Sequence, residues 1–250
     1  MIVLSEILSA NEYIRQRIEP RPGDPAYLCL SDLLIALKGL IPTSAARVLD
    51  FGCGGSPYRA LFTLCQTYHR ADLSGDGLDF EFTDDARLPD YVGDSYDCVL
   101  STQVLEHVAE SSTYLRESYR ALRPGGTLVL STHGMFEEHG CPDDYWRWTG
   151  FGLRRAVEDA GFQVDTIKKI TTGPRAILSL SEPLLWSVRF SGGFRAHLID
   201  LALRAGRRVG PIRVHKTADA LLANHRVVDV SEPDSTYVGL ALRAFKGGTV

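Results

Sequence analysis

Residues 47–57 have the sequence R-V-L-D-F-G-C-G-G-S-P, and the rest of the chain is organised around them. Val48 and Leu49 form a short apolar run that enters an acid, Asp50, and three glycines follow within four positions. This pattern predicts a buried strand that ends in a tight turn whose backbone can press against a ligand. Pro57 fits the first position of a helix, where its missing N–H costs nothing. The stretch therefore predicts a cofactor cradle made of a strand, a glycine loop and a helix N-terminus.

Two classes of cofactor use such a cradle. A dinucleotide site has the pattern G-x-G-x-x-G, but counted from Gly52 the sixth position is Pro57. An acid directly before the glycines disfavours phosphates and suits a cofactor with a cationic amino-acid portion. With Asp50 there, the stretch resembles motif I of class I S-adenosylmethionine (SAM) methyltransferases, V-L-D-x-G-C-G-x-G, with Ser56 in place of the last glycine. The resemblance implies that Asp50, Gly52 and Gly54 contact SAM and that S-adenosylhomocysteine is the product. A chance glycine-rich turn is the alternative.

Composition is that of an ordinary globular protein. The chain has 250 residues, 44% of them hydrophobic and 23% charged, which suits one α/β domain with insertions. A net charge of −4 makes nucleic acid an unlikely partner. The sequence lacks both an apolar run of about 18 residues, as a membrane span needs, and a basic N-terminal region. Five widely spaced cysteines without a C-x-x-C pair indicate neither a zinc site nor a disulfide framework, so we expect no metal and a cytoplasmic protein.

The next predicted strand, residues 68–73, ends in an acid. Asp72 lies 22 residues beyond Asp50 and is placed to accept hydrogen bonds from both ribose hydroxyls of the cofactor. Leu73, its neighbour, belongs to the same expected binding segment. The alternative is a plain turn aspartate before a Ser-Gly pair.

Two further segments complete the expected cofactor site. Residues 81–89, E-F-T-D-D-A-R-L-P, resemble the adenine-edge segment of these methyltransferases. The resemblance implies that Asp85 accepts the exocyclic amine and that the Ala86 N–H reaches the ring, although a solvated acidic loop is the alternative. Residues 96–102, Y-D-C-V-L-S-T, predict a buried strand that continues as Q-V-L-E-H-V, which resembles motif IV of the family and places Ser101 in the cofactor set.

Strands and helices alternate through residue 170. The remaining expected helices cover residues 26–40, 58–65, 113–122 and 151–161, and the remaining strands cover 127–132, 162–170 and 237–245. This alternation indicates a Rossmann-like α/β fold with a seven-stranded, mostly parallel sheet and helices on both faces. We expect residues 1–250 to form a single methyltransferase domain, with an N-terminal helical segment over 1–45 and a helical insertion or lid over 171–229.

The loops after the fourth and fifth strands should carry the chemistry, because ligands of open α/β sheets bind at the carboxyl ends of the strands. His133 directly follows the fifth strand, so the sheet positions it, and its unperturbed pKa suits a general base. His107 follows the fourth strand and is the second candidate. The alternative is that both histidines are structural or that no side-chain base acts.

The segment 143–149, D-D-Y-W-R-W-T, is rich in aromatic residues. It resembles D-Y-x-R-[WF]-T segments of family members associated with glycan and polysaccharide clusters. Tyr145 and Trp146 suit stacking on a sugar or aromatic ring, and Arg147 suits a two-pronged hydrogen bond to a carboxylate or phosphate. Packing of the tryptophans against the sheet is the alternative.

The insertion is locally basic. Residues 174–226 hold nine Arg or Lys and three Asp or Glu, a local charge of +6, among many apolar residues. Such a segment can lie on an anionic membrane or contact a phosphate-bearing or lipid-linked substrate, with Arg207 and Arg208 as expected contacts. A helical lid or a homodimer contact is the alternative.

The sequence thus predicts SAM-dependent methyl transfer to a small-molecule acceptor, most simply a hydroxyl of a sugar, glycan-type or other natural-product substrate. Two other hypotheses remain open at this point. The chain is either an RNA methyltransferase that uses the basic insertion as its nucleic-acid face, or a SAM-binding regulator without activity.

Overall fold

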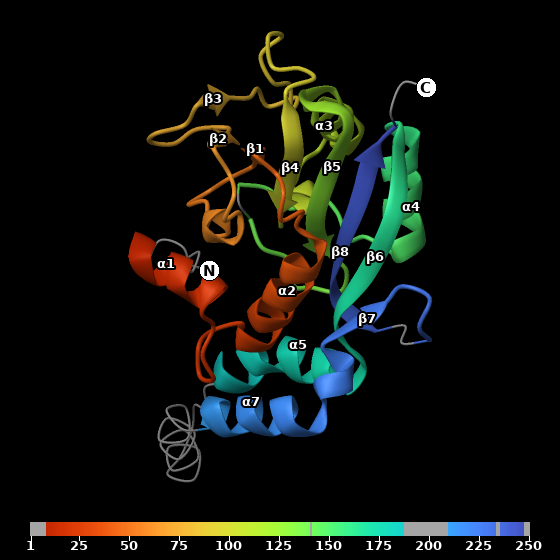
Figure 1. Ribbon diagram of the computed structural model, residues 1–250. Coiled ribbons are helices and arrows are strands. Elements are labelled where there is room, and N and C mark those ends of the chain that lie inside the picture. Colours follow the sequence, from red (N-terminus) through yellow and green to blue (C-terminus); the bar gives the residue numbers. More distant parts are fainter. Residues whose placement is uncertain (1–8, 141, 188–209, 234–235, 248–250) are drawn as a thin grey trace.

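The computed structural model describes residues 9–140, 142–187, 210–233 and 236–247. In that part of the chain eight strands form one sheet in the order β3-β2-β1-β4-β5-β8-β6-β7 (Figure 1). In chain order the strands are β1 (Arg47–Phe51), β2 (Thr67–Asp72), β3 (Phe80–Glu81), β4 (Tyr96–Thr102), β5 (Leu122–His133), β6 (Phe162–Thr172), β7 (Val227–Asp229) and β8 (Tyr237–Lys246). Strands β1 to β5 pair in parallel, whereas β8 runs antiparallel between β5 and β6. This is the Rossmann-like, mostly parallel α/β fold that the sequence predicts.

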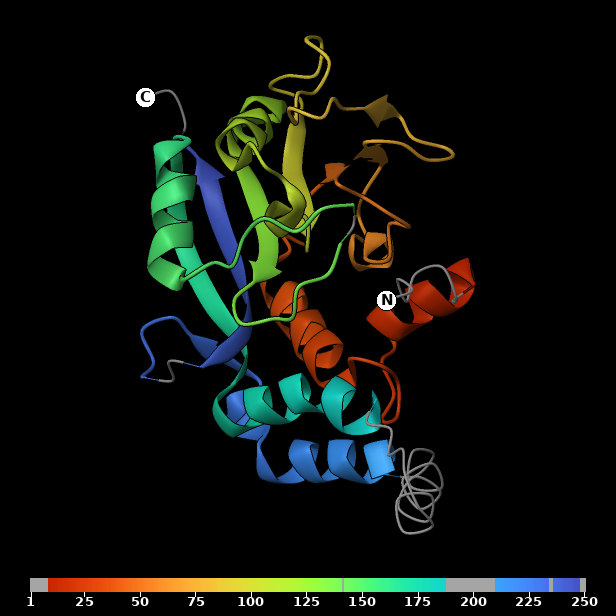
Figure 2. The same cartoon turned by 180° about the vertical axis from the view of Figure 1, so that it is seen from behind.

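Helices cover both faces of the sheet (Figure 2). The helices are α1 (Ala10–Ile18), α2 (Tyr27–Leu40), α3 (Ser111–Ala121), α4 (Gly150–Asp159), α5 (Gly173–Ser187) and α7 (Gly210–Leu221), with 3₁₀ turns η2 (Arg59–Leu61), η3 (Leu105–His107) and η4 (Ala223–His225). On one face Leu33 and Leu37 of α2 pack in a buried cluster with Val129 of β5. On the other face Leu115 of α3 and Leu153 of α4 belong to a second cluster. Alternate residues of the central strands therefore enter opposite cores, as expected for a sheet that is covered on both sides.

Two sequence predictions about elements are corrected. The sheet has an eighth strand, because Val227 and Val228, two β-branched residues, pair with β6 and cover its outer edge. The helix expected over residues 58–65 is reduced to the single turn η2. The connection over residues 52–66 instead follows successive turns, in which the Ser56 N–H donates to Cys53 O and the Cys65 N–H donates to Phe62 O.

The insertion forms the helices α5 and α7, which lie together beneath α2 at the end of the molecule where β6 finishes (Figure 1). This is the carboxyl end of the parallel strands. Helix α5 packs on β6 and β8. Arg207 and Arg208 lie outside the described residues.

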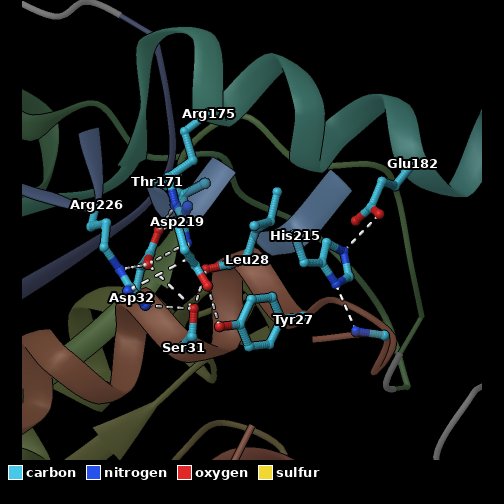
Figure 3. Close-up of polar contacts among 11 residues, drawn as sticks. Tyr27, Leu28, Ser31, Asp32, Thr171, Arg175, Glu182, His215, Asp219 and Arg226 are labelled. Carbon is cyan, nitrogen blue, oxygen red and sulfur yellow. Dashed lines mark hydrogen bonds and ion pairs between the residues drawn. The ribbon is translucent and has the colours of Figure 1, made fainter. Parts of the chain in front are cut away.

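Buried ion pairs attach the insertion to α2 (Figure 3). The Asp32 carboxylate accepts from Arg175 Nε at 2.7 Å and from Arg226 Nε at 2.7 Å, and the Thr171 hydroxyl donates to it at 2.9 Å. Asp32 and Arg175 are fully buried. Arg175 Nη2 also donates to Asp219 Oδ1 at 3.0 Å. We call Asp32, Arg175, Asp219 and Arg226 the Asp32 network.

A second set of contacts lies beside this network. The Tyr27 hydroxyl donates to Asp219, and the Tyr27 ring stacks on His215 with the ring centres 4.8 Å apart. His215 Nε2 lies 2.7 Å from Glu182 Oε1 of α5, and His215 Nδ1 accepts from the backbone N–H of Gly23 at 2.9 Å. Helices α2, α5 and α7 therefore meet through polar contacts as well as apolar ones.

Candidate functional site

The glycine loop after β1 is held from two sides. Gly52 has a φ of 74°, and a Cβ at this position would lie 2.5 Å from Val104 Cγ1, so both the backbone and the packing require glycine. Its N–H donates to Ala71 O of β2 at 2.8 Å. Gly54 N–H donates to Asp72 Oδ2 at 2.7 Å. The loop is thus bound to the end of β2 and packs against the segment that follows β4.

Arg70 of β2 explains why serine is tolerated at the last glycine position of the motif. Its Nη2 donates to Gly54 O at 2.9 Å, and its Nε donates to Ser56 Oγ at 3.0 Å. Ser56 adopts a positive φ of 50°, the region that glycine would favour. The serine hydroxyl therefore supplies a contact to Arg70 that a glycine would lack.

The two acids of the expected cofactor site have different surroundings. Asp50 is buried and accepts from the Tyr68 hydroxyl at 2.7 Å, and burial raises the pKa of its carboxyl to about 7. Asp72 is only partly buried, and its Oδ1 accepts from Leu73 N–H at 2.8 Å. Each oxygen of Asp72 accepts one backbone hydrogen bond, which leaves further lone pairs for ribose hydroxyls.

The adenine-edge residues make contacts within their own loop. The exposed Asp85 carboxylate accepts from Thr83 and, at 2.8 Å, from Arg87 Nε. Ala86 is buried, has a φ of 65°, and donates its N–H to Thr83 O at 2.7 Å. The Ser101 hydroxyl on β4 lies 2.9 Å from the hydroxyl of the buried Tyr114. These three residues stay predictions as cofactor contacts.

Three histidines from different segments meet at the carboxyl ends of β4 and β5. His107 ends η3, His133 ends β5, and His139 belongs to the loop between β5 and α4. The ring centre of His139 lies 4.9 Å from that of His107 and 5.1 Å from that of His133. We call these three residues the histidine cluster. The sequence predicted roles for His107 and His133, and the fold brings both against His139.

His133 is buried beside a buried carboxyl group. Its ring stacks on Phe136 at 4.1 Å, and its Nε2 lies 3.3 Å from Glu106 Oε1. Glu106 is fully buried and accepts from the Thr132 hydroxyl at 2.8 Å. Burial lowers the pKa of His133 well below its ordinary value and raises the pKa of Glu106 to about 7. His133 is therefore neutral at pH 7, whereas Glu106 is neutral only below about pH 7.

His107 is half-buried and its tautomer is set by one contact. Its Nδ1 lies 2.6 Å from the carbonyl oxygen of Asp143, which can only accept a hydrogen bond. The neutral ring must then carry its proton on Nδ1, so Nε2 keeps a free lone pair. Burial, as the largest cause, lowers the pKa of His107, so the neutral form prevails at pH 7. A neutral ring with an unprotonated Nε2 is the form that a general base requires.

The aromatic segment divides into exposed and packed rings. Tyr145 is 50% exposed and Trp146 is 42% exposed, and the Trp146 indole donates to Val108 O at 2.9 Å. Trp148 instead packs against the core on the α3 and α4 side of the sheet. Arg147 donates to the Asp144 carboxylate with both Nη atoms at 2.6 Å. The structure thus has two exposed rings, as stacking on a substrate would need, and an arginine that is paired within its own loop.

Comparison with known families identifies the chain. Residues 23–167 match the family model described as a methyltransferase domain, which is more than half of the chain. The chain belongs to this family. It is a class I SAM-dependent methyltransferase, and SAM is its cofactor.

Curated and solved relatives agree with this assignment. The ubiquinone biosynthesis O-methyltransferase of Ruegeria pomeroyi is 33% identical over 106 residues, which cover 36% of this chain and 42% of that protein. The chain therefore spans less than half the length of this curated relative. A SAM-dependent methyltransferase structure from Thermotoga maritima superposes with a TM-score of 0.57 at 17% identity, covering 94% of this chain and 95% of that one. Phosphoethanolamine N-methyltransferase 2 of Haemonchus contortus gives 0.51 at 16% identity, covering 96% and 57%. At these identities the structures establish the fold alone.

Two groups in the site of this methyltransferase were not assigned a role from sequence. Glu106 directly precedes His107 in the chain, but its burial beside His133 depends on the approach of β5 to η3. His139 lies in a loop without periodic pattern, so only the folded loop shows that it reaches the other two histidines. In the described ranges no group of three or more His, Cys, Asp or Glu residues is arranged to hold a metal ion. None of the helices that the structure describes is long and apolar enough to cross a membrane.

Proposed function

We propose that this methyltransferase transfers the methyl group of SAM to a hydroxyl of a small-molecule acceptor, with His107 as the general base. The single observation that carries the proposal is the contact of 2.6 Å between His107 Nδ1 and Asp143 O, which leaves Nε2 unprotonated. The curated relatives are O-methyltransferases, and this similarity supports a hydroxyl acceptor. A hydroxyl needs a base to accept its proton during methyl transfer, whereas a neutral amine does not.

The residues of the cradle fit SAM. In this proposal Asp72 accepts hydrogen bonds from the ribose hydroxyls, which the lone pairs left on its oxygens support, and the loop of Gly52 and Gly54 contacts the methionine portion. Asp50 lies beneath that loop, where its carboxyl group favours a cationic ligand. Bound SAM supplies the activated methyl group. The protein's own residues orient the acceptor, exclude water and accept the proton.

His133 is the second candidate for the base. It stands at the end of β5, where the sheet positions it, but its ring lies under Phe136 and its side chain is only 8% exposed. An acceptor hydroxyl reaches the half-buried His107 with less rearrangement of the loop. In this proposal His133 and Glu106 form the wall of the site, and His107 accepts the proton.

The exposed rings of Tyr145 and Trp146 support an acceptor with an aromatic or sugar ring. Each of these side chains offers an apolar ring face for stacking and a polar O–H or N–H group at its edge. The insertion supports contact with a phosphate-linked or lipid-linked part of such an acceptor, since its described portion includes Arg213 and Lys216 on α7 beside the exposed Leu221. A dimer contact through the same helices is the competing proposal for this surface.

The test measures methyl transfer from radiolabelled SAM to a panel of sugars, phenols and amines, with the parent and three histidine variants. His107→Gln should lower kcat by about 10²–10⁴-fold while SAM affinity stays unchanged. The matched control is His69→Gln on β2, whose ring contacts the Tyr96 hydroxyl and not the site. If His133→Gln loses activity and His107→Gln does not, His133 rather than His107 is the base. Normal turnover in both variants would refute a histidine base, and preference for amines would refute the hydroxyl acceptor.

A further inference from the structure

All the hydrogen bonds that Arg147 donates go to other residues of its own loop, between β5 and α4. Its Nε donates to Phe136 O at 3.1 Å, its Nη1 donates to Asp144 Oδ1 at 2.6 Å and to Trp146 O at 2.8 Å, and its Nη2 donates to Glu137 O and to Asp144 Oδ2, each at 2.6 Å. A guanidinium group has five donor hydrogens, so these five bonds use all of them. The two-pronged contact with a substrate that the sequence predicted would require Arg147 to give up bonds inside the loop.

The partner of Arg147 is well shielded from water. The Asp144 side chain is only 3% exposed, and its Oδ2 also accepts the backbone N–H of His139 at 2.9 Å. Hydrogen bonds from Arg147 are the largest cause that holds the pKa of Asp144 well below its usual range. The carboxylate therefore stays ionised throughout the neutral pH range, and Arg147, paired with it, joins this end of the loop to the carbonyl groups of Phe136 and Glu137 at the other end.

This pair lies one residue from the carbonyl group that sets the tautomer of His107. Asp143 O is bonded to His107 Nδ1, and Asp143 directly precedes Asp144 in the chain. Holding the Asp144 carboxylate therefore restricts the direction of the preceding peptide. The other titratable and charged groups that act on His107 include His139, whose ring centre is 4.9 Å away, and His133, together with Asp144 and Arg147 themselves.

We propose that Arg147 is a positioning residue for the base: through Asp144 it holds the Asp143 carbonyl against His107 Nδ1 and so keeps Nε2 unprotonated. This inference rests on the proposed function for its catalytic consequence, but the tautomer itself is a property of the folded chain. Arginine suits this role better than lysine, because only the planar fork satisfies both carboxylate oxygens and three carbonyl groups at once.

The test is nitrogen NMR of the full chain labelled with 15N-histidine and saturated with S-adenosylhomocysteine, with the His107 signals assigned from the His107→Gln variant. In the parent, His107 should carry its proton on Nδ1. In Arg147→Lys and in Asp144→Asn the signals should show a mixture of both tautomers. The titration midpoint of His107 should also shift from that of the parent, because burial and Arg147 lower this pKa whereas the bond to Asp143 and the charge of Asp144 raise it, and the variants change this balance.

The matched control is Arg155→Gln, which removes an arginine from an exposed pair with Asp159 on α4. It should leave the tautomer, the midpoint and the methyl-transfer rate unchanged. A parent with the proton on Nε2, or variants that both keep the parent's tautomer and midpoint, would overturn the inference. If one variant does not fold, judged by its melting curve, the other decides.

Kinetics then separate this inference from the proposed function. In Arg147→Lys, kcat should fall about 10²-fold, as for a misplacement of catalytic groups by about 1 Å, while the KM for SAM stays that of the parent. An Arg147→Lys variant with the parent's kcat would overturn the positioning role. A His107→Gln variant that methylates normally would refute the base instead, and it would leave the tautomer result standing.

Discussion

The Asp32 network and the region around the histidine cluster each contain a fully buried carboxyl group, Asp32 or Glu106, but these groups differ in their partners. Asp32 faces Arg175 and Arg226, two permanent cations, and accepts hydrogen bonds from both. Glu106 faces His133 and Thr132, neither of which carries a permanent charge. The comparison shows that burial alone does not decide what a carboxyl group does.

The two regions also differ in whether their buried polar atoms have hydrogen-bond partners. Asp32 accepts bonds at both oxygens, whereas Glu106 Oε1 and His133 Nδ1 lack a hydrogen-bond partner among the residues that the structure describes. Burial without a permanent counter-charge raises the pKa of Glu106 to about 7 and lowers the pKa of His133 well below its ordinary value. Burial also raises the pKa of Asp32, but the bonds and charges of Arg175 and Arg226 oppose that shift, and these ion pairs attach the helices. One region is therefore suited to hold the insertion and the other to exchange protons.

One side chain joins the two regions. Phe136 stacks on His133 and also packs in a cluster with Cys29 of α2 and with Ala176 and Leu180 of α5. The helices that the Asp32 network attaches thus form the support of the ring that covers His133. Variants that separate the two regions are the direct way to test the comparison.

The largest effect is expected from Asp32→Asn. The change leaves the fully buried Arg175 without its main counter-charge, which should cost about 3–5 kcal/mol of unfolding free energy. Urea unfolding measures the loss. The matched control is Asp165→Asn, whose partner Arg243 is at the surface and which should cost at most about 1 kcal/mol. Equal losses in both variants would show that the Asp32 network is no more important than a surface pair.

Asp72→Ala should weaken SAM binding while it leaves both buried regions intact. The loss of hydrogen bonds from the ribose hydroxyls to a charged group should cost about 1.5–3 kcal/mol. Titration calorimetry measures the SAM affinity. Because the Gly54 N–H loses its acceptor in this variant, an unfolding curve of the variant serves as the control for a loss of stability. Equal SAM affinity in variant and parent would remove Asp72 from the cofactor site.

Glu106→Gln tests the region around the histidine cluster through pH. The folded pKa of Glu106, about 7, lies above the ordinary value of 4.5, so the folded protein retains a proton that the unfolded chain releases between these values. The parent should therefore lose stability as pH rises from 4.5 to 7, by about 1.4 kcal/mol for each pH unit at most, and the variant should not. Unfolding midpoints across this range give the difference.

His133 needs a control in this experiment, because its lowered pKa has the opposite effect. The unfolded chain protonates this histidine first as pH falls below 6.5, so its contribution to stability is lost toward acid pH. The pH dependence of unfolding is therefore also compared between His133→Gln and the double variant with Glu106→Gln. A pH profile that is identical in parent and Glu106→Gln in both backgrounds would contradict the assignment of a raised pKa to Glu106.

The smallest effect is expected from Tyr27→Phe, which tests the edge of the Asp32 network. The Tyr27 hydroxyl donates to Asp219, but Asp219 keeps its bond from Arg175. The loss should be about 1 kcal/mol, as for a single hydrogen bond whose acceptor retains another donor. A cost as large as that of Asp32→Asn would show that Tyr27, rather than the ion pairs, holds the insertion.

The sequence by itself determined the cradle and the class of fold. Asp50, Gly52, Gly54 and Asp72 are local signals, because a strand end, a glycine turn and an acid at the next strand end are all encoded within short segments. The alternation of strands and helices likewise predicts a mostly parallel sheet. Local patterns did not predict η2 in place of a helix over 58–65, because this segment packs Tyr58 and Phe62 against α2, a contact between distant parts of the chain.

Only the tertiary structure decided the surroundings of the reactive side chains. The sequence predicted Arg147 as a substrate contact, yet the folded loop uses all five of its donor hydrogens. Glu106, His133 and His139 come together through contacts between β4, β5 and a loop, which no sequence spacing specifies. Burial and charge partners set pKa values and tautomers, and both depend on residues distant in the chain. The sequence therefore predicts the cofactor, and the fold determines the burial and the hydrogen-bond partners of each histidine.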